Sequence, residues 1–537
     1  MSTAPPVSGT PEPIEVGSFF LETLTTGMYE NPFHCIREYV QNGYDAIEDA
    51  IRVGLLGADD GRILISIGGT QRAPSLTIRD NGIGIPAAKA YSTLVSLGAS
   101  RKTPALHAGF RGIGRLAGIA YCTTLRFTTS AGGEPVATVV EYDCGHVRSF
   151  FSPGAEPIDV REVVRSSVKT RTIEANAAEH FTQVEMLHLV NLGTEFVDLT
   201  MLQPYLRQVC PVDYPDKFDF ADQVRSLAEG FGEPIGAIHV ETRQKRENTP
   251  ILKPYTNVYP TGPRVAPSKI HSLQTFSSRE HGWFAWIGVS NFPGEIVDET
   301  VAGVRFRIKN IQVGDAEIIT DLAEELTAGG SERRLMRWAV GEIFLTNPKV
   351  VPNARRDGFE DSPEWRAVRR DIKEQVVKQI TKLVRSASTT RSAMKAITDA
   401  LKEVTEQAQV PDLTAIAKAN IEAAIKRNLN SLASRDRLLV ADPKEVSELT
   451  AKFKELQEKL AKREIKEPEP QPEPGDDQDD ADADNSGGND ADDADGGDAT
   501  APTRADVIFS ALCTELEEVQ ARKLAELIVQ KLYEAGL

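Results

Sequence analysis

The segment EYVQNGYDAIED, residues 38–49, constrains the fold more than any other part of this chain. Glu38, Asn42 and Asp45 follow one another at i, i+4 and i+7, which places them on one face of a helix. Apolar side chains recur at roughly helical spacing on the other side; they are Ile36, Val40, Ile47 and Ile51. The sequence therefore predicts an amphipathic helix that buries one side and presents an acid and an amide on the other.

Two glycine-rich motifs follow this segment. The predicted strand SLTIRD ends at Asp80, which is the first residue of DNGIGIP, residues 80–86. GFRGIG, residues 109–114, precedes RLAGIAY, which the pattern predicts as a helix. The backbone N–H groups at such a helix start can bind phosphates. Because no GxxxxGK[ST] motif occurs in the sequence, the three motifs together predict a nucleotide site that is not a P-loop.

Composition and charge limit the classes of protein. A chain of 537 residues, of which 40% are hydrophobic, is expected to form roughly two to four soluble domains. The net charge of −18 falls to −4 once the 14 acidic residues of 467–498 are set aside. A body of that charge argues weakly against a protein built to bind nucleic acid, although it leaves room for a local basic patch.

The cysteines and the N-terminal residues indicate a cytoplasmic protein. The 5 cysteines are scattered without a CxxC pair, which fits a reducing compartment better than disulfides or a zinc site. Residues 1–13 have neither the basic region nor the apolar core of a signal peptide, and no run of about 18 apolar residues occurs. We therefore expect a cytoplasmic location without contact with a membrane.

Hydrophobic patterning predicts an α+β fold followed by helices. Short alternating strands are expected at 61–67, 75–80, 124–129, 136–142, 147–151 and 181–189. A second α+β unit is expected to contain strands at 282–289 and 303–313 and a helix at 332–344. The predicted regions are a disordered segment at 1–13, a first α+β domain at 14–230, a second α+β domain at 235–375, a helical or coiled-coil region at 376–465, an acidic linker at 466–502 and an amphipathic helix at 503–537.

The three motifs resemble those of the GHKL, or Bergerat-fold, ATPases, a superfamily that includes gyrase, the ninety-kilodalton heat-shock chaperones, histidine kinases and MutL-type proteins. Residues 19–47, FFLETLTTGMYENPFHCIREYVQNGYDAI, are also similar to the start of the heat-shock chaperone ATPase domain. The resemblance implies an α/β sandwich that binds ATP with Mg²⁺, followed by a second, transducer-like α+β domain.

The polar residues of the predicted helix suit metal binding and hydrolysis. Asn42 offers a neutral amide oxygen, a hard ligand suited to Mg²⁺. Glu38, one turn earlier on the same face, is placed to orient or deprotonate a water for attack on the γ-phosphate. Asp45, together with Asp49, is expected to contribute to the nucleotide pocket by supporting it rather than by touching phosphate.

The second motif predicts an adenine site. Asp80 ends a strand, and its carboxylate can accept a hydrogen bond from the exocyclic amine of adenine, where guanine carries a carbonyl. Gly82 and Gly84 allow the backbone to turn close to the base. Thr182 resembles the family's late strand threonine, which helps to hold the aspartate and the base, although β-propensity alone also explains a threonine in a strand.

The third motif predicts a phosphate loop with a lid before it. The residues expected to bind phosphates through the backbone are Gly109, Gly112, Ile113 and Gly114. Residues 97–108, LGASRKTPALHA, are small, basic and polar, as is typical of a lid that closes over a nucleotide. Lys102 or Arg101 is expected to supply positive charge from this lid.

A loop of the second domain resembles the chaperone loop that carries a catalytic arginine. Aligning Asn353 of VVPNARRDGFED with the asparagine of that loop places Arg356 at the catalytic position, with Arg355 beside it. A cation there stabilises charge in the transition state of phosphoryl transfer. Lys309, in RFRIKNIQVGD, is the alternative if the arrangement is closer to gyrase or MutL.

The resemblance implies an ATP hydrolase that works as a dimeric, ATP-driven clamp and remodels protein clients. The terminal amphipathic helix at 503–537 must bury its apolar stripe, which favours docking or self-association and therefore a homodimer. Beyond residue 360 the sequence departs from the chaperones, since it has no room for their full middle and dimerisation domains. The alternative function is a nucleic-acid-associated ATPase of the MORC or MutL sort, in genome defence.

Overall fold

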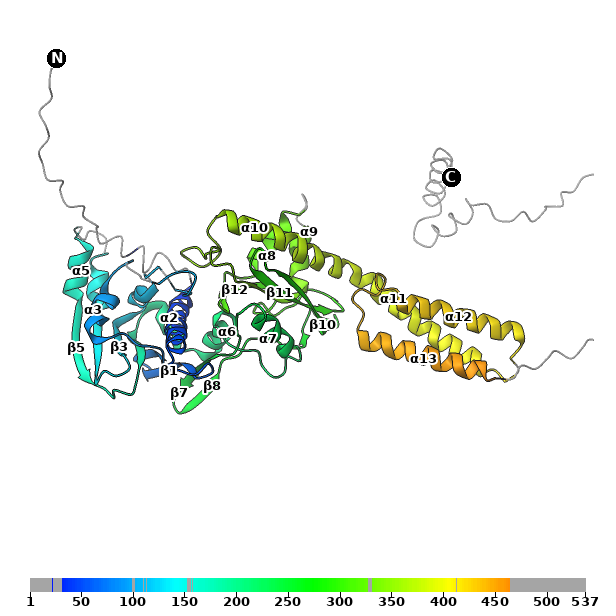
Figure 1. Cartoon of the computed structure of the whole chain (residues 1–537), viewed down its shortest axis with the longest axis horizontal. Coiled ribbons are helices and arrows are strands. Elements are labelled where there is room, and N and C mark those ends of the chain that lie inside the picture. Colours follow the sequence, from blue (N-terminus) through cyan, green and yellow to red (C-terminus); the bar gives the residue numbers. More distant parts are fainter. Residues whose placement is uncertain are drawn as a thin grey trace, which may run out of the picture. The chain divides into compact units, whose positions relative to one another are not determined.

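The first sheet has eight strands in the order β5-β4-β3-β6-β2-β1-β7-β8 (Figure 1). Its neighbouring strands are antiparallel, except that β1 and β7 are parallel. The strands are β1 (Gly61–Thr70), β2 (Ala73–Asp80), β3 (Cys122–Ser130), β4 (Val136–Asp143), β5 (Val168–Glu174), β6 (Phe181–Leu189), β7 (Ile238–Gln244) and β8 (Glu247–Pro250).

Helix α2 (Phe33–Arg52) packs against β1 and β2 and begins the core of this sheet. Ile36, Val40 and Ile47 are buried among the sheet's apolar side chains, as the helical spacing predicts. The other short elements around the sheet are α3 (Ala87–Val95), the 3₁₀ helix η1 (Gly114–Ala120), α4 (Cys144–Ser149), α5 (Val160–Ser167), the 3₁₀ helix η2 (Asn191–Val197) and α6 (Leu199–Val209). The predicted helix at 38–49 is confirmed.

Two local predictions in this region are wrong. The strand expected at 147–151 is instead the end of α4 and a turn, because the side chain of Asp143 accepts a hydrogen bond from His146 N and caps a helix there. RLAGIAY forms a 3₁₀ helix rather than an α-helix. The hydroxyl of Tyr39 donates to Arg115 O (3.0 Å) and accepts from Gly118 N (2.9 Å), so a side chain satisfies backbone groups within this turn.

The second sheet has six strands in the order β13-β12-β14-β11-β10-β9. They are β9 (Val258–Tyr259), β10 (Ser268–Ser278), β11 (Trp283–Ser290), β12 (Gly303–Ile308), β13 (Ile311–Val313) and β14 (Val340–Leu345). The helix predicted at 332–344 is wrong in its second half: α9 (Ser331–Leu335) and the 3₁₀ helix η3 (Met336–Trp338) lead directly into β14. Every residue of β14 is buried, Glu342 included, and a strand that is buried on both sides shows no two-residue period to distinguish it from a helix.

The chain crosses between the two sheets. Tyr214, Phe218 and α7 (Ala221–Glu229) pack against Phe284 and Trp286 of the second sheet. The chain then returns to the first sheet, where β7 and β8 extend it to Pro250. The first sheet therefore continues beyond the predicted domain end at 230, and the segment just before that end belongs to the second core.

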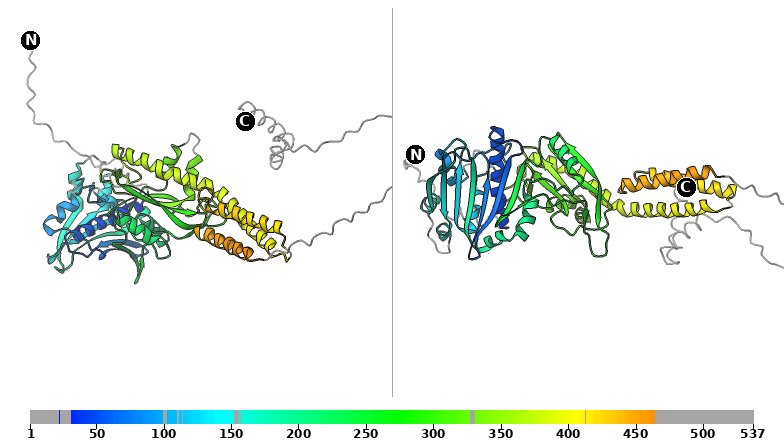
Figure 2. Two further views of the ribbon diagram at one scale, coloured as in Figure 1. Left: turned by 45° about the vertical axis from the view of Figure 1, so that its right-hand side comes forward. Right: turned by 90° about the horizontal axis from the view of Figure 1, so that it is seen from below.

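A long helical region follows the second sheet, as predicted. Its elements are α10 (Pro363–Ile372), the π-helical turn η4 (Lys373–Val377), α11 (Lys378–Gln409), α12 (Ala415–Ala433) and α13 (Pro443–Ala461). Helix α8 (Glu317–Glu324) lies earlier in the chain and packs against β12 of the second sheet. The first half of α11 packs on the second sheet through Ile380 and Leu383. Its second half lies beside α12 and α13 (Figure 2), around a core that includes Ile397, Ile425 and Phe453.

The computed structural model describes residues 22, 31–98, 102–109, 111–112, 114–151, 156, 158–326, 331–411 and 413–463. These residues lie within one unit, Met1–Pro468. The predicted disordered N-terminus, the acidic linker and the terminal helix lie outside the described residues. No helix within those ranges is long and apolar enough to cross a bilayer. The two sheets and the helical region confirm the predicted α+β class.

Candidate functional site

A cavity of about 710 Å³ lies beside the polar face of α2. Glu38 and Asn42 line it from α2, and Asp80 lines it from the end of β2. The structure thus brings together residues that the first two sequence motifs supply. Asn42 has no side-chain hydrogen bond to any other described residue, so its amide oxygen is available to a ligand in the cavity.

Asp80 is a buried carboxylate at the edge of this cavity. It is 7% exposed, and its Oδ1 accepts a hydrogen bond from Gly82 N at 2.9 Å. Burial raises the pKa of Asp80 from 3.8 to about 7, although the backbone N–H groups of Gly82 and Thr182 and the charge of Lys102 act in the opposite direction. A carboxylate has about four acceptor positions, so these two hydrogen bonds leave capacity for a ligand donor.

The glycines after Asp80 stand where no side chain fits. A Cβ on Gly82 would lie 2.5 Å from Ala46, and one on Gly84, whose φ is +68°, would lie 1.9 Å from Ser130 O. Thr182 also lines the cavity, opposite Asp80 in the β2–β6 pair.

Thr129 is a supporting residue that the sequence reasoning missed. Its hydroxyl lies 3.2 Å from that of Thr182 and accepts from Ile85 N at 2.9 Å. It therefore ties β6 to the loop that carries the glycines. Thr129 is next to Thr182 through strand pairing rather than sequence spacing, so no local pattern marks it.

Asp45 is not among the described residues that line the cavity. It is fully buried and holds the loop in place. It accepts from Ala108 N (2.7 Å) and Gly109 N (2.9 Å) and pairs with Lys102 Nζ (2.8 Å). The expected supporting role agrees with this geometry, because the carboxylate fixes the start of the third motif beside α2.

Lys102 and Asp49 both line the cavity. The carboxylate of Asp49 also lies 3.3 Å from Nε2 of His107. The Nδ1 atom of His107 accepts from Thr103 N at 3.2 Å, so Nε2 carries the proton that faces Asp49. The segment before the third motif is therefore held to α2 at two acidic residues one turn apart. Arg101 lies outside the described residues.

The third motif contributes Gly109, Gly112 and Gly114 to the wall of the cavity. Gly112 has a φ of +72°, and a Cβ on Gly114 would lie 2.2 Å from Glu38 Oε2. Glycine at 114 thus lets the loop approach the acid of α2 without displacing its carboxylate. Ile113, predicted to belong to the same phosphate loop, lies outside the described residues.

A loop of the second sheet domain reaches into this cavity. Pro352 and Phe359 bridge its two sides, and Arg356 lies near its tip with a φ of +59°. Arg356 is 6% exposed; its Nε lies 3.2 Å from Glu38 Oε1, and a terminal guanidinium nitrogen donates to Ala108 O at 2.5 Å. Burial lowers the pKa of Arg356, while the charge of Glu38 raises it. A residue 318 positions after Glu38 therefore completes the wall.

Two further arginines fasten this loop, and the sequence reasoning did not single them out. Arg111, inside the third motif, donates to Pro352 O (2.8 Å) and Asn353 O (3.2 Å). Arg37 donates to Arg355 O at 3.2 Å from α2. The position of Arg111 within GFRGIG was the available signal, but its partners are distant in sequence.

Arg355, the neighbour of Arg356, and Lys309, its alternative, lie elsewhere in the described structure. The side chain of Arg355 is exposed and is not among the described lining residues of the cavity. Lys309 lies in the β12–β13 turn, where its charge acts on Glu48 and Glu233. Of the three second-domain cations named from the sequence, Arg356 is the one that lines the cavity within the described ranges.

Residues 29–164 match the family model described as "Histidine kinase-, DNA gyrase B-, and HSP90-like ATPase". This segment is a GHKL-type ATPase domain. The match contains α2 and both glycine motifs, whereas Thr182 and Arg356 lie beyond it. It is a match to the family as a whole and does not assign the chain to the heat-shock chaperones. A search of curated proteins found no match to the chain.

The GHKL-type domain implies ATP binding, and the residues present fit that ligand. Asp80 offers a buried acceptor, the glycines at 84 and 112 open the backbone to a close approach, and Asn42 offers a free amide oxygen. Neutral amide oxygen is a ligand type that Mg²⁺ accepts.

Proposed function

We propose that the GHKL-type domain binds ATP and hydrolyses it to ADP and phosphate. Asp80 accepts from the adenine amine, and the glycine loop at 109–114 faces the phosphates with its backbone N–H groups. The depth of Asp80 supports this, because a buried acceptor rejects a base that presents a carbonyl at the same place.

Asn42 is the residue that would hold Mg²⁺. The ion, when bound, neutralises phosphate charge and so favours attack by water. Asn42→Ala is expected to weaken the dependence of nucleotide affinity on Mg²⁺, as measured by calorimetry with and without the metal. Equal Mg²⁺ dependence in this variant and the wild type would remove Asn42 from the metal site.

Glu38 and Arg356 have different roles in the proposed hydrolysis. Glu38 orients the attacking water and accepts its proton, and Arg356 stabilises the charge that develops on the transferred phosphoryl group. The single observation that carries this proposal is the buried Arg356–Glu38 contact, at 3.2 Å, between a second-domain loop and the polar face of α2. Taking an arginine side chain out of water costs free energy, so an arginine without a role in the cavity would be expected to stay at the surface.

Arg356→Ala in the full chain tests the division of roles, with Arg355→Ala as its matched control. We expect Arg356→Ala to lower kcat roughly 100-fold or more with little change in ATP affinity, since the guanidinium acts on developing charge. Arg355→Ala removes the same group from an exposed neighbour and is expected to keep wild-type kcat. Wild-type turnover in Arg356→Ala would overturn the proposed role of the second domain.

We further propose that hydrolysis drives a dimeric clamp that remodels a protein partner. The site needs a residue from each of two domains, so hydrolysis depends on how those domains are arranged. A change of nucleotide in the cavity can therefore change the domain arrangement, and a bound protein partner would respond to that change. The predicted amphipathic helix at 503–537 would join two copies.

The clamp is tested by the molar mass of the full chain with and without a non-hydrolysable ATP analogue. A dimer stabilised by the analogue, with ATPase activity that rises more than linearly with protein concentration, is expected. A monomer under both conditions would exclude the dimeric clamp. Turnover stimulated by DNA, with steep salt dependence, would overturn the assignment of a protein partner.

A further inference from the structure

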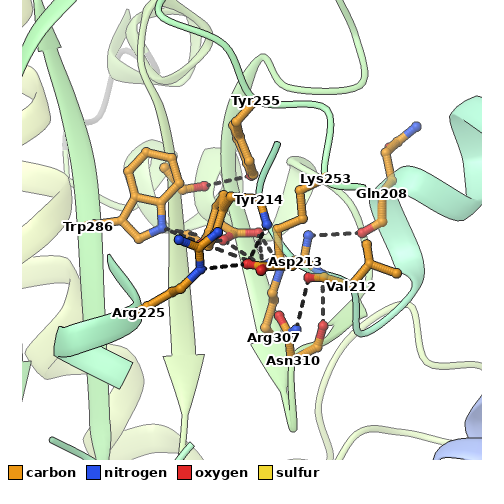
Figure 3. A network of polar contacts seen from close by, with 12 residues as sticks. Gln208, Val212, Asp213, Tyr214, Arg225, Lys253, Tyr255, Trp286, Arg307 and Asn310 are labelled. Carbon is orange, nitrogen blue, oxygen red and sulfur yellow. Dashed lines mark hydrogen bonds and ion pairs between the residues drawn. The ribbon is translucent and has the colours of Figure 1, made fainter. Parts of the chain in front are cut away.

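A buried cluster of charged side chains, formed by Lys253, Arg307 and Glu342, lies at the second sheet (Figure 3), and none of the three lines the cavity. Lys253 and Glu342 are fully buried, and Arg307 has only 1% of its side chain exposed. Lys253 Nζ lies 3.0 and 2.9 Å from the two carboxylate oxygens of Glu342, which also pair with Arg307 Nε and with the hydroxyl of Tyr214. Burial alone would raise the pKa of Glu342, but Arg307 and Lys253 outweigh it and hold the pKa at about 2.

Such a cluster is a poor way to gain stability. Removing charges from water costs several kcal/mol for each ion, and well-packed apolar residues of the same volume are often as stable. A buried ion pair can, however, fix the geometry of the elements that carry it. Its contacts therefore show which elements it joins.

Arg307 joins three parts of the chain. Through Nε it binds Glu342 of β14, and its two terminal nitrogens donate to Asn310 O in the β12–β13 turn (2.9 Å) and to Gln208 O near the end of α6 (3.0 Å). Asn310 Nδ2 in turn donates to Val212 O at 3.1 Å, as the dashed lines of Figure 3 show. The β12–β13 turn is thereby fixed to the segment that leaves the first sheet domain.

The other end of β13 holds the catalytic loop of the second domain. Gly314 N donates to Arg356 O at 2.8 Å, and Gln312 Nε2 donates to Gly314 O at 2.8 Å. Gly314 has a φ of +59°, and a Cβ there would lie 2.7 Å from Asp357 O. The three residues of β13 thus connect the Arg307 cluster to the backbone of Arg356.

We propose that Arg307 is a positioning residue for Arg356, which it acts on through the β12–β13 hairpin. The guanidinium fixes the turn of the hairpin against α6 and β14, and Gly314 at the far end sets the backbone from which Arg356 enters the cavity. The inference rests on the proposed role of Arg356 in hydrolysis.

Three variants of the full chain distinguish this positioning role from simple support of the fold: Arg307→Lys, Gly314→Ala and Lys253→Met. Lysine keeps the charge beside Glu342, but its single ammonium nitrogen cannot reach the three partners that Arg307 contacts with three separate nitrogens. Lys253→Met is the matched control, because it removes a cation from the same buried cluster and leaves the Arg307 contacts to the turn in place. Thermal unfolding of each variant records the structural effect.

We expect Arg307→Lys and Gly314→Ala to lower kcat roughly 10- to 100-fold with ATP affinity unchanged, since a small misplacement of a catalytic group has an effect of that size. Lys253→Met is expected to keep the wild-type kcat, whatever its unfolding temperature. In the Arg356→Ala background, Arg307→Lys should cause no further loss in single-turnover hydrolysis, because the residue through which it acts is gone.

The same factor of loss in both backgrounds, or an equal loss of kcat in Lys253→Met, would overturn the inference and make the cluster purely structural. Failure of the proposed function has a different signature. Wild-type turnover in Arg356→Ala alone would remove Arg356 from the mechanism, whereas an impaired Arg356→Ala beside a fully active Arg307→Lys would overturn only the positioning role.

Discussion

At the scale of single residues, the site keeps a buried acid at a cost in stability. Asp80 is 7% exposed and its pKa is raised to about 7 by burial. In the unfolded chain the same group has a pKa of about 3.8. Between these values the native protein holds a proton that the unfolded chain has released, so stability falls as pH rises through this window and the penalty is complete above pH 7.

Asp80→Asn is therefore expected to separate stability from binding. Without ligand at pH 8, the variant should unfold about 2–4 °C above the wild type, because the buried negative charge is gone. It should also fail to bind ATP, which calorimetry measures. Asp59→Asn, at an exposed acid, is the control and should change neither quantity. Wild-type ATP affinity in Asp80→Asn would remove Asp80 from the adenine site.

Glu38 and Arg356 form a second residue-scale test, because Arg356 is buried against the carboxylate of Glu38, whose side chain is 12% exposed. Glu38→Ala should abolish hydrolysis, retain ATP binding and lower the free energy of unfolding by about 3–5 kcal/mol, since it leaves Arg356 buried without its anion. Glu38→Gln should abolish hydrolysis with a smaller loss of stability.

Chemical denaturation and ATP titration measure the two effects. The double variant Glu38→Ala with Arg356→Ala should be more stable than the sum of the two single losses predicts, because the unpaired charge is no longer present. Additive losses would mean that the 3.2 Å contact contributes no coupling.

At the scale of elements, α2 organises the site by fixing the third motif. Asp45 accepts from the backbone of residues 108 and 109, and Glu38 lies where a side chain at 114 would stand. The helix thus fixes the glycine loop and the position of Glu38 at once. The loop in turn binds the second-domain loop through Arg111.

Gly114→Ala tests this alignment. The added Cβ would lie 2.2 Å from Glu38 Oε2, so the acid must move, and we expect kcat to fall roughly 10- to 100-fold with less effect on ATP affinity. Gly145→Ala, at an exposed position in α4 whose nearest contact is 3.4 Å away, is the control and should retain full activity. Full activity in Gly114→Ala would show that the loop can yield without displacing Glu38.

At the scale of the whole described unit, neither sheet domain is one continuous segment of the chain, because segments of the two cores alternate in the sequence. Tyr214, Phe218 and α7 belong to the second core, while β7 pairs with β1 in the first sheet. A boundary near residue 230 therefore cuts both domains. The same unit holds the second-domain loop whose Arg356 contacts Glu38 of α2.

A truncated chain ending near residue 230 is expected to be much less stable than the whole protein. It loses β7 and β8 from the first sheet and exposes the apolar face of α7 to solvent. Thermal unfolding and size-exclusion chromatography should show a lower transition and aggregation. A chain ending at Pro468 keeps every described contact and is the control, expected to bind ATP normally. A stable, monomeric 1–230 fragment would contradict the shared architecture.

Local patterns predicted much of this fold. The helix at 38–49, most strands of the first sheet and the helical region after 362 follow from periodicities of 3.6 or 2 residues. The misassigned segments lack such a signal: β14 is buried on both faces, and α4 is fixed by the cap at Asp143.

The sequence by itself determined the α+β class, the polar face of α2 and the two glycine motifs, because each depends on residues a few positions apart. Only the tertiary structure decided that Arg356 rather than Lys309 lines the cavity, that Asp45 binds backbone instead of lining it, and that Thr129 supports Thr182. These contacts depend on strand pairing and on the crossing of the chain between two cores, and nothing in the spacing of neighbouring residues encodes them.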